Sequence, residues 1–245
     1  MRTRLDLEMA RRGLAESGEG AQRLIMAGKV RVNSRPASKA DLKVDAETEI
    51  AVVGATSEYA SRGGYKLAAA IDHFHIDVTG RRALDIGAST GGFTDVLLQR
   101  GVAAVVALDV GYGQLAEKLR RDPRVVVMDR TNIRKVAAAD LPYPPDLIVI
   151  DTSFISLRLV LPEVIELAAP KAEIIALVKP QFEVGKGKVG KGGVVRDAAM
   201  RQEALAGILA FAREAGLAVV GSIESPIQGA AGNVEYLALF RKGNP

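Results

Sequence analysis

The chain has 245 residues, enough for one ordinary domain and a small one, and its 48% hydrophobic content can build a substantial core. The absence of Cys excludes disulfides and thiolate metal sites, and with only His73 and His75 we expect no zinc or other bound metal. No apolar run reaches the length of a membrane span, and Met1 is followed at once by charged residues, so we expect a cytoplasmic protein with no membrane partner.

Charge is unevenly distributed along the chain. Residues 1–45 contain ten Lys and Arg against six Asp and Glu, which gives this segment a net charge of +4. Residues 46–60 contain three Glu and no basic residue. Local basicity of this kind favours a polyanionic partner. A solvated charged face would have the same composition, so charge alone does not decide between the two.

The N-terminal segment predicts two short helices and a hairpin. Thr3 is placed to cap a helix over 4–12, and Ser17 is placed to cap a second helix over 18–27 that Gly28 ends. The stretch over 29–36 then indicates an alternating strand that runs into a turn, and a second strand follows near 50–53.

The order of these elements resembles the S4 RNA-binding domain over roughly the first 55 residues. The matching phrases are Arg4-Leu-Asp6, Gly13-Leu-Ala-Glu-Ser17, Leu24-Ile25 and Gly28-Lys-Val-Arg-Val-Asn33. The resemblance implies that the helix pair and its basic residues grip structured RNA through phosphates and shape. The candidate RNA contacts in this segment are Arg4, Arg11, Arg12, Arg23, Lys29, Arg31 and Arg35.

A polar, glycine-containing stretch over 54–59 indicates a domain boundary. We predict an S4-like domain over 1–55, a linker over 56–61 and a second domain over 62–245. A glycine-permitted turn at 61–65 then leads into an Ala-rich helix over 66–74. Lys66 at the start of this helix opposes the helix dipole, which suggests a functional role, although a single lysine is more often simply solvated.

Strands and helices alternate over the rest of the chain. Strands are expected near 83–86, 103–109, 124–128, 147–150, 173–178, 218–224 and 234–241. This order predicts a doubly wound, Rossmann-like α/β sheet of seven strands. The connection over 225–233 is too short for a crossover helix, so the last strand should run antiparallel to its neighbour.

The stretch from Ala83 to Phe93, which reads Ala-Leu-Asp-Ile-Gly-Ala-Ser-Thr-Gly-Gly-Phe, indicates a strand, a tight turn and a helix start around a cofactor. Asp109 ends the next apolar run, where a nucleotide-type ligand presents its ribose hydroxyls. A dinucleotide site needs G-x-G-x-x-G. The spacing from Gly87 to Gly91, preceded by Asp85, instead suits a ligand without phosphates and with an ammonium group, namely S-adenosylmethionine. An ordinary βα turn is the alternative.

Charged residues follow two fully apolar strands at the same edge of the predicted sheet. Asp151 follows 147–150 and Lys179 follows 174–178, while Glu235 returns to this edge on the antiparallel strand. With Lys66, these residues form a cluster of two lysines and two carboxylates. A lysine held in a partly dry cleft can take a proton from a hydroxyl or stabilise the alkoxide as it attacks. A salt-bridge network that caps the sheet is the alternative.

Lys66, Asp151, Lys179 and Glu235 match in order the K-D-K-E tetrad of FtsJ/RrmJ-like ribose 2′-O-methyltransferases. Within that group the chain resembles the TlyA family, whose members combine this domain with an S4 domain and are also called haemolysin. The matching phrases are Ser61-Arg-Gly-Gly-Tyr-Lys-Leu67, Asp85-Ile-Gly-Ala-Ser-Thr-Gly-Gly-Phe93, Asp109-Val-Gly-Tyr-Gly-Gln-Leu115, Asp151-Thr-Ser-Phe-Ile-Ser156 and Val178-Lys-Pro-Gln-Phe-Glu-Val-Gly185.

This resemblance implies methyl transfer from S-adenosylmethionine to the 2′-hydroxyl of a cytidine in ribosomal RNA. Lys179 is expected to face the hydroxyl and Asp151 to orient it, with Lys66 and Glu235 completing the cluster. The sequence agrees on a negative point, because Asp151-Thr-Ser-Phe lacks the two prolines of the motif that base-amine methyltransferases carry after the fourth strand. No metal is required, since the sulfonium is already an activated methyl donor.

The cofactor is expected to contact residues after four strands. Asp109 should hold the ribose hydroxyls, Asp85 and the glycine turn should face the methionine end, and Asp129 is placed for the adenine amine, with a helix N-cap as the alternative role for Asp129. The full predicted set is Asp85, Gly87, Ser89, Gly91, Gly92, Phe93, Asp109, Val110, Asp129, Arg130 and Asp151.

The segment 185–192 mimics a P-loop, but Gly192 stands where Ser or Thr should bind Mg²⁺, so we reject nucleotide hydrolysis. A basic loop beside Lys179 is better interpreted as a clamp on RNA phosphates, with a solvated loop as the alternative. We expect Arg62, Lys186, Lys188 and Lys191 to join the S4 arginines in one electrostatic track.

Three other functions compete with the methyltransferase. A non-catalytic RNA-binding or ribosome-assembly factor would not need an intact tetrad, and a nicotinamide oxidoreductase would need another glycine spacing. Membrane lysis lacks support, because there is no basic amphipathic helix with bulky aromatics. The sequence does not name the ribosomal subunit, although the short termini resemble the family's shorter form and so favour the large subunit weakly.

Overall fold

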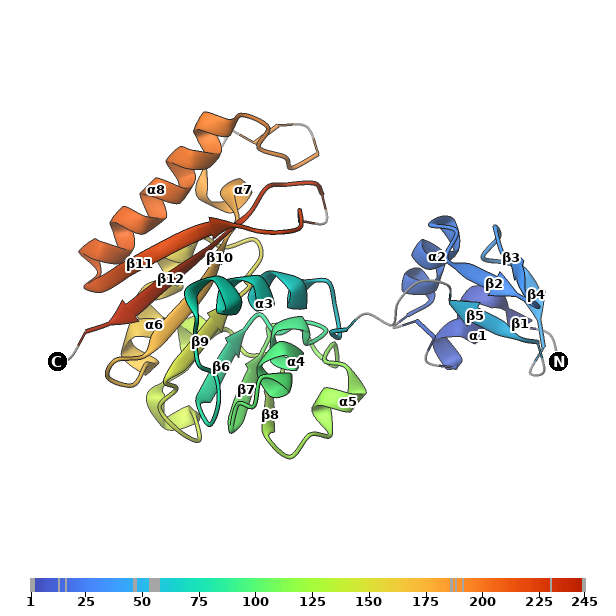
Figure 1. Ribbon diagram of the computed structural model, residues 1–245, viewed down its shortest axis with the longest axis horizontal. Helices are drawn as coiled ribbons and strands as arrows, with labels where there is room; N and C mark the ends of the chain where they lie inside the picture. Colours follow the sequence, from blue (N-terminus) through green and yellow to red (C-terminus); the bar gives the residue numbers. More distant parts are fainter. Residues whose placement is uncertain are drawn as a thin grey trace. The chain divides into compact units, whose positions relative to one another are not determined.

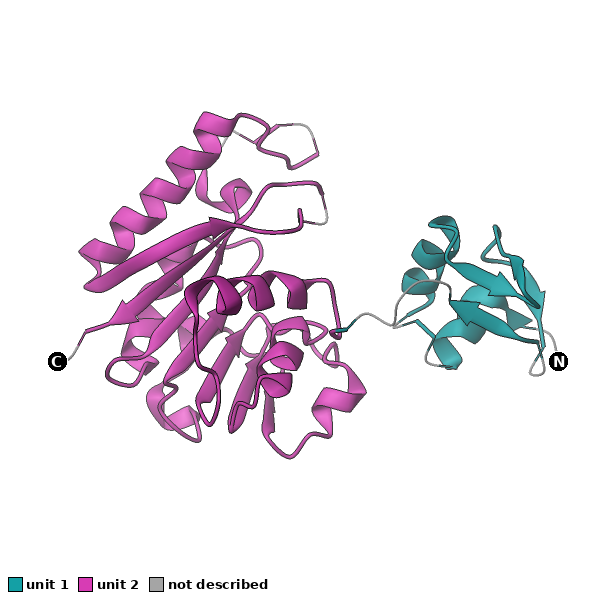
Figure 2. Cartoon of the chain, viewed as in Figure 1, with its two compact units in different colours: residues 1–58 teal, residues 59–245 magenta. Residues whose placement is uncertain are grey.

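The computed structural model describes residues 3–12, 14–15, 17–45, 48–52, 58–185, 187, 189–190, 192–229 and 231–243. The chain divides into two compact units, unit 1 over Met1–Glu58 and unit 2 over Tyr59–Pro245 (Figure 2). The boundaries predicted from the sequence, with a linker over 56–61, stay a prediction, and residues 53–57 lie outside the described ranges.

Unit 1 packs two helices against short strands (Figure 1). Its elements are β1 (Thr3–Arg4), α1 (Leu5–Arg11), α2 (Gly18–Met26), β2 (Val30–Val32), β3 (Arg35–Pro36), β4 (Lys43–Val44) and β5 (Ile50–Val52). Strands β3, β2 and β5 form one antiparallel sheet, and β1 pairs with β4 in another. Buried Leu5, Met9, Ile25 and Val30 form the shared core.

One local prediction in unit 1 is wrong and two are confirmed. Thr3 does not cap the first helix, because it pairs in β1 and leaves Arg4 at the N-cap without a side-chain capping bond. The predicted strand does run into a turn, which falls at Asn33 and Ser34, whose positive φ angles of 47° and 64° fit a tight hairpin, and Arg35 begins the next short strand. Ser17 does cap the second helix, since its side chain accepts the amide of Gly20 at 3.0 Å.

Unit 2 is built on one seven-stranded sheet (Figure 1). Its helices and strands are α3 (Gly63–Phe74), β6 (Arg82–Ile86), α4 (Gly92–Gln99), β7 (Ala104–Leu108), α5 (Glu117–Arg120), β8 (Val125–Met128), β9 (Leu147–Ile150), α6 (Leu161–Leu167), β10 (Glu173–Val178), α7 (Pro180–Glu183), α8 (Ala198–Glu214), β11 (Leu217–Glu224) and β12 (Tyr236–Lys242). Short 3-10 turns are η1 (Ile133–Lys135), η2 (Ala138–Asp140) and η3 (Leu157–Leu159).

The strand order is β11-β12-β10-β9-β6-β7-β8, and β12 runs antiparallel to both neighbours while the central strands are parallel. This confirms the predicted Rossmann-like sheet with an antiparallel last strand. The chain leaves β6 in one direction toward β7 and β8 and later returns to the other side through β9. The carboxyl ends of β6 and β9 therefore flank the switch point at which such sheets bind ligands.

Alternate strand residues face two hydrophobic layers, as the period of a β-strand requires. Leu84 and Ile86 pack in one cluster with Ile208 of α8, whereas Ala83 lies in the opposite cluster with Leu67 of α3 and Leu97 of α4. Both faces of the sheet are thus covered, which leaves its carboxyl edge as the place where polar side chains gather. None of the helices in the described ranges combines the length and apolar character that a bilayer crossing requires.

Candidate active site

Four charged side chains from four elements meet in two ion pairs at the carboxyl edge of the sheet. Lys66 Nζ of α3 lies 2.6 Å from Glu235 Oε2, and Lys179 Nζ lies 2.6 Å from Asp151 Oδ1. The β10–β12 register pairs Val178 with Tyr236, so the next step of the antiparallel ladder sets Lys179 against Glu235. The structure therefore brings together all four residues of the predicted tetrad.

These ion pairs are withdrawn from solvent. Lys66 and Lys179 are each 8% exposed and Glu235 is 3% exposed, while Asp151 is half-buried. Lys179 Nζ also donates a hydrogen bond to Ser153 Oγ at 3.0 Å, a contact that the sequence did not reveal. A hydroxyl placed beside Lys179 would meet an ammonium that a carboxylate and a serine already orient.

Lys66 reaches the site from further inside its helix than the sequence suggested. The helix α3 begins at Gly63 rather than at Lys66, because Gly63 and Gly64 continue the helix instead of forming a turn. Gly64 has no room for a Cβ against the ring of Tyr59. The close packing of this segment fixes Lys66 over Glu235.

The cofactor loop has the backbone that its glycines predict. Gly87 and Gly91 have φ angles of 85° and 96°, in the left-handed region, and Gly91 is the N-cap of α4. A Cβ on Gly87 would lie 2.6 Å from the carbonyl oxygen of Asp151, and a Cβ on Gly92 would collide with Ser61 Oγ. The turn can therefore pass between the ends of β6 and β9 only with glycine at these positions.

Asp85 lies beneath this loop with an exposure of 0%. Thr94 Oγ1 donates to its Oδ2 at 2.6 Å, whereas its Oδ1 has no hydrogen-bond partner among the described residues. Burial, with the nearby charge of Asp151, raises the pKa of Asp85 to about 7. An unpaired buried carboxylate oxygen is costly unless a donor or a proton arrives.

Asp109 and Asp129 organise the loops after β7 and β8. The two oxygens of Asp109 accept the amides of Ser89 at 2.8 Å and Gly111 at 2.7 Å, which joins the cofactor loop to the next one. Asp129 accepts the amide of Gly113 at 3.1 Å and pairs with Arg120 at 2.8 Å. The bond from Arg120 holds the pKa of Asp129 below its ordinary value.

Neighbouring side chains in these loops are exposed. Val110 is 70% exposed, and the guanidinium of Arg130 lies 4.2 Å from the ring centre of exposed Tyr112. Both flank the carboxyl ends of β7 and β8. They form a surface of apolar and planar groups where a ring of a ligand could rest.

Three non-glycine residues after strands at this edge adopt the left-handed conformation. They are Ser89 after β6, Arg130 after β8 and Phe154 after β9, with φ angles of 47°, 54° and 63°. Such backbone costs roughly 1–3 kcal/mol per residue and persists only where surrounding contacts impose it. Strain after three of the four strands β6, β7, β8 and β9 makes this edge a candidate functional site.

Several residues of the site escaped sequence reasoning. Thr94, Ser153 and Gln114, which accepts from Ser89 Oγ at 3.2 Å, have no spacing signal. Thr94 reaches Asp85 from helix α4, and the other two reach their partners from loops. Buried Asp95 accepts the amide of Ala60 at 2.7 Å and pairs with Lys118 at 2.7 Å. The sequence signal that could have identified Asp95 is its position one helical turn after the glycines of the cofactor loop.

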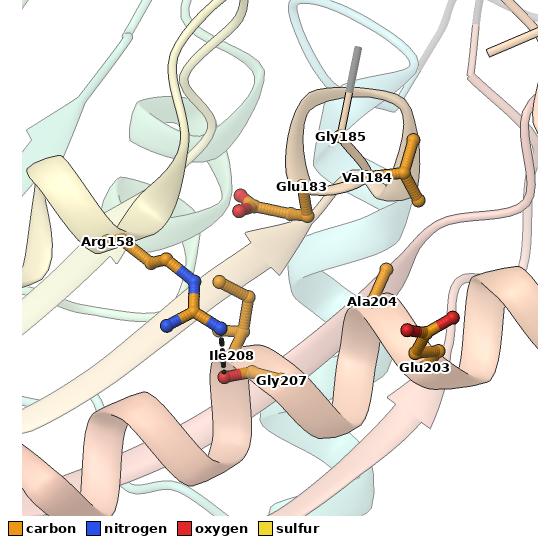
Figure 3. Close-up of a pocket in the computed structure, with 8 residues that line it drawn as sticks. All are labelled: Arg158, Glu183, Val184, Gly185, Glu203, Ala204, Gly207 and Ile208. Atoms are coloured by element: carbon orange, nitrogen blue, oxygen red, sulfur yellow. Dashed lines mark hydrogen bonds between the residues drawn. The ribbon is translucent and has the colours of Figure 1, made fainter. Parts of the chain in front are cut away.

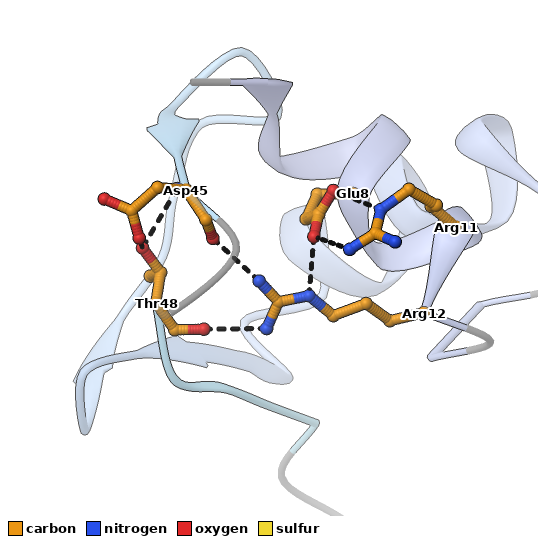
Figure 4. A network of polar contacts seen from close by, with 5 residues as sticks. All are labelled: Glu8, Arg11, Arg12, Asp45 and Thr48. Atoms are coloured by element: carbon orange, nitrogen blue, oxygen red, sulfur yellow. Dashed lines mark hydrogen bonds and ion pairs between the residues drawn. The ribbon is translucent and has the colours of Figure 1, made fainter. Parts of the chain in front are cut away.

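The basic residues of unit 1 divide into bonded and unbonded groups. Glu8 holds Arg11 at 2.6 Å and Arg12 at 2.7 Å, and Arg12 also donates to the carbonyls of Asp45 and Thr48 at 2.7 Å each (Figure 4). Arg4 pairs in the same way with Asp6 at 2.8 Å. Among the predicted RNA contacts within the described ranges, those that are exposed and make no such bond are Arg23, Lys29, Arg31 and Arg35, and Lys39 and Lys43 are exposed in the same way.

The remaining predicted RNA contacts belong to unit 2. Arg62 is exposed at the N-cap of α3. Lys186, Lys188 and Lys191 lie outside the described residues. The predicted track that joins them to the S4 arginines stays a prediction.

A pocket of about 200 Å³ lies between α7 and α8 (Figure 3). Glu183 and Arg158 line it from one side, and Ala204, Gly207 and Ile208 of α8 line it from the other. No residue of the predicted tetrad or cofactor set lines this pocket. In the part of the chain that the structure describes, no group of three or more His, Asp or Glu side chains could hold a metal ion.

The residues present fit S-adenosylmethionine on two observations. The orphaned Oδ1 of Asp85 offers a buried acceptor at the cofactor loop, and the loop carries no Cβ at Gly87, Gly91 and Gly92, where the space for one is already taken. The fold, the loop and the tetrad together define the class of protein: a Rossmann-like methyltransferase domain preceded by a small RNA-binding type of domain.

Comparison with known proteins makes this class more specific. A model of FtsJ-like methyltransferases matches residues 59–242, and a model of the S4 domain matches residues 3–50. The 16S/23S rRNA (cytidine-2′-O)-methyltransferase TlyA of Mycobacterium tuberculosis is 52% identical over 241 residues, which cover 98% of this chain and 90% of that protein. The chain belongs to the TlyA family of FtsJ-like methyltransferases, and its methyl donor is S-adenosylmethionine.

Two further relatives agree along the whole chain. Hemolysin A of Brachyspira hyodysenteriae is 41% identical and covers 97% of this chain and 99% of its own length. A solved structure from Streptococcus thermophilus has a TM-score of 0.80 and 42% identity, and covers 99% of this chain and 89% of that one. The relatives thus share both units of the chain.

Proposed function

We propose that the protein transfers a methyl group from S-adenosylmethionine to the ribose 2′-hydroxyl of a cytidine in ribosomal RNA. The observation that carries this proposal is the pair of buried lysine–carboxylate contacts beside the cofactor loop. The printed name of the relative from Mycobacterium tuberculosis supports the choice of substrate. Paired charges at the ligand-binding edge of such a sheet, beside a cofactor loop, are typical of a catalytic site, which supports a reaction over a purely structural network.

In this proposal Lys179 faces the 2′-hydroxyl and stabilises its oxygen as the oxygen–methyl bond forms. The methyl–sulfur bond would break to leave S-adenosylhomocysteine, and the hydroxyl proton would pass by way of the Lys179–Asp151 pair to solvent. Asp151 and Ser153 hold the ammonium of Lys179 in place through contacts of 2.6 Å and 3.0 Å. Lys66, fixed by Glu235, adds a second positive charge on the side of α3. The sulfonium supplies an activated methyl carbon, so the residues have to align the hydroxyl and exclude water rather than form a covalent intermediate.

The proposed cofactor contacts follow the carboxyl edge. Asp109 would hold the ribose hydroxyls, and Asp85 would compensate the ammonium of the methionine end. The adenine would rest near Val110 and Arg130, with Asp129 at its amine. Ser89 and the backbone from Gly91 to Phe93 would complete the binding surface. These roles rest on position along the sheet edge.

RNA is proposed to bind first through the cations that make no internal ion pair. Arg23, Lys29, Arg31 and Arg35 are exposed on α2 and the β2–β3 hairpin, which suits contacts to phosphates. Arg62, Lys186, Lys188 and Lys191 are proposed to extend this contact to the second unit. We favour the large subunit as the substrate and, because that substrate is ribosomal, the cytoplasm as the location.

Mass spectrometry of nucleosides tests this function directly. Unmodified small and large ribosomal subunits are incubated with the protein and trideuteromethyl S-adenosylmethionine, and their RNA is digested. We expect deuterated 2′-O-methylcytidine from the large subunit, and none without enzyme. Label found only on a base would overturn the ribose assignment. No label on either subunit, despite measured binding of RNA and cofactor, would support a non-catalytic assembly factor instead.

A further inference from the structure

The two loops that carry the predicted catalytic residues are joined at three points. Lys179 contacts Asp151 and Ser153 at the start of the post-β9 loop, defined as residues 151–157. The rings of Phe154 and Phe182 lie 5.2 Å apart in the middle of this loop. The third point is Glu183, the last residue of α7, which binds the end of the loop.

Both carboxylate oxygens of Glu183 are used at this third point. Ser156 Oγ donates to Oε2 at 2.5 Å, and the amide of Leu157 donates to Oε1 at 2.9 Å. Ser156 Oγ in turn accepts the amide of Arg158 at 3.1 Å. Glu183 therefore closes the N-terminus of η3 from another part of the chain, because none of the 3-10 residues can bond these amides.

The surroundings make this bond hard to replace by water. Glu183 is partly buried between η3 and α8, with Arg158 as the nearby cation (Figure 3). Burial raises the pKa of Glu183 above its ordinary value, and the bonds from Ser156 and Leu157 oppose that shift. A carboxylate kept in such a place against its desolvation cost has a structural or functional task.

The task of Glu183 follows from the conformation of the post-β9 loop between its contacts with Lys179 and with Glu183. Phe154 has a φ of 63° and is 90% exposed, so the loop is strained at its middle, where the contact with the ring of Phe182 still leaves most of Phe154 in solvent. The strained conformation is nevertheless the one in which Ser153 reaches Lys179. Fixing both ends of a seven-residue loop leaves it few alternatives, because the closure entropy is already lost.

We propose that Glu183 is a positioning residue for methyl transfer: by holding Ser156 and Leu157 it keeps Ser153 and Asp151 aligned on the ammonium of Lys179. The inference rests on the proposed function for its kinetic part. Its structural part, the coupling between α7 and the post-β9 loop, is measurable without any reaction.

The test compares Glu183→Gln, Glu183→Ala and Ser156→Ala with a matched control, Glu214→Gln, at the exposed end of α8. Single-turnover methylation of unmodified large subunits gives the rate at saturating cofactor, and calorimetry gives the affinity for S-adenosylmethionine. We expect Glu183→Ala to slow transfer by about a hundredfold, because small misplacements of catalytic groups cost about that much. Cofactor affinity should stay within about twofold, since the cofactor loop follows another strand.

Glu183→Gln keeps one acceptor, so its transfer rate should recover most of what Glu183→Ala loses. If Glu183 were needed only for its bulk, Glu183→Gln would transfer methyl at the full wild-type rate. Amide hydrogen exchange in peptides covering 151–157 should speed up in Glu183→Ala and stay unchanged elsewhere in the sheet. Ser156→Ala should lie between the two Glu183 variants.

Two results would overturn the proposal. One is a normal transfer rate in Glu183→Ala, and the other is unchanged exchange in the post-β9 loop. If the wild-type protein transfers no methyl group, the proposed function fails, yet the exchange experiment still decides whether Glu183 fixes the loop. General loss of folding in Glu183→Ala, with full activity in Glu183→Gln, would assign the residue to stability alone.

Discussion

The two ends of the seven-stranded sheet both carry ion pairs, and they use different cations. At the amino end, Arg81 pairs with Asp146 at 3.3 Å and Glu173 at 2.6 Å, and Arg241 adds a second contact to Glu173 at 2.9 Å. At the carboxyl end, lysines make the two pairs of the predicted tetrad beside β9, β10 and β12, and an arginine pair, Arg120 with Asp129, lies at the outer strand β8. The amino end has arginine forks, one of which also donates to the carbonyl of Asp146.

The two kinds of cation suit different tasks, namely holding strands together and taking part in a reaction. A guanidinium binds two acceptors in a fixed plane and stays charged, so Arg81 fastens the starts of β6, β9 and β10 together. An ammonium is a compact charge on a flexible stem, which can approach a reacting oxygen and exchange a proton. We therefore propose that ion pairs of similar length serve stability at the amino end and the reaction at the tetrad.

The largest effect on methyl transfer is expected from removing a lysine at the carboxyl end of the sheet. Lys66→Met is expected to slow methyl transfer by about a thousandfold, because a positioned charge of this kind contributes about that much. It also leaves Glu235 buried without its partner, which lowers stability. The double variant Lys66→Met/Glu235→Gln should regain the melting temperature and not the rate. Recovery of both would mean that Lys66 serves only to neutralise Glu235.

The matching change at the amino end should do the reverse. Arg81→Met removes a guanidinium from two carboxylates and should lower the free energy of unfolding by about 3 kcal/mol. For a protein of this size the melting temperature would fall by roughly 8 °C. Methylation measured well below the transition should stay within about twofold of wild type. A large loss of rate with normal stability would show that the two ends are not separate in function.

The distinction between bonded and unbonded cations extends to unit 1. Arg31→Ala/Arg35→Ala should weaken RNA binding by about tenfold and flatten its dependence on salt, because two phosphate contacts are lost. Arg12→Ala should instead lower the stability of unit 1, since its guanidinium bonds Glu8 and two carbonyls. Filter binding at several salt concentrations, with a melting curve for each variant, separates the two. Equal losses of RNA affinity in Arg12→Ala and in Arg31→Ala/Arg35→Ala would contradict the distinction between bonded and unbonded cations.

The smallest expected effect is a dependence on pH. Burial raises the pKa of Asp85 to about 7, whereas at the amino end burial of Glu173 is outweighed by Arg81 and Arg241, which hold its pKa below the ordinary value. A raised carboxyl pKa means that the stability linked to Asp85 is present at low pH and is lost as the pH rises toward 7.

Binding of a cationic methionine end should favour the ionised form of Asp85. The affinity for S-adenosylmethionine should therefore increase by about threefold between pH 6.5 and 7.5, with release of a proton. Calorimetry in buffers of different ionisation enthalpy measures that proton. Asp85→Asn should show neither effect, and an unchanged pH dependence in this variant would exclude Asp85 as the titrating group.

The parts predicted from sequence were those encoded locally. Asp151 and Lys179 directly follow apolar runs, so the ends of these buried strands could be predicted. Because the strands are parallel, both residues were expected at the same edge of the sheet. The cap at Ser17 and the turns at Gly87 and Gly91 were visible for the same reason. Whether these residues carry out the roles assigned to them stays a prediction.

The parts not predicted depend on contacts between distant loops. Ser153 and Glu183 reach their partners only once a strained loop has taken its path, and no periodicity in the sequence records that path. The pairing of Arg11 and Arg12 with Glu8 likewise separates them from the unbonded cations, although all appear as basic residues in the sequence. Thr3 was predicted to cap a helix because its strand partner, Val44, is distant in the sequence, so no local pattern indicates that pairing.

The most direct test of the central claim is single-turnover methyl transfer by Lys179→Met on unmodified large subunits, with cofactor and RNA affinities measured on the same preparation. We predict a rate at least about a thousandfold below wild type, with both affinities within about threefold. A rate within about tenfold of wild type would contradict the claim that the carboxyl-end lysines perform the chemistry, and would leave the ion pairs at both ends of the sheet with the same structural task.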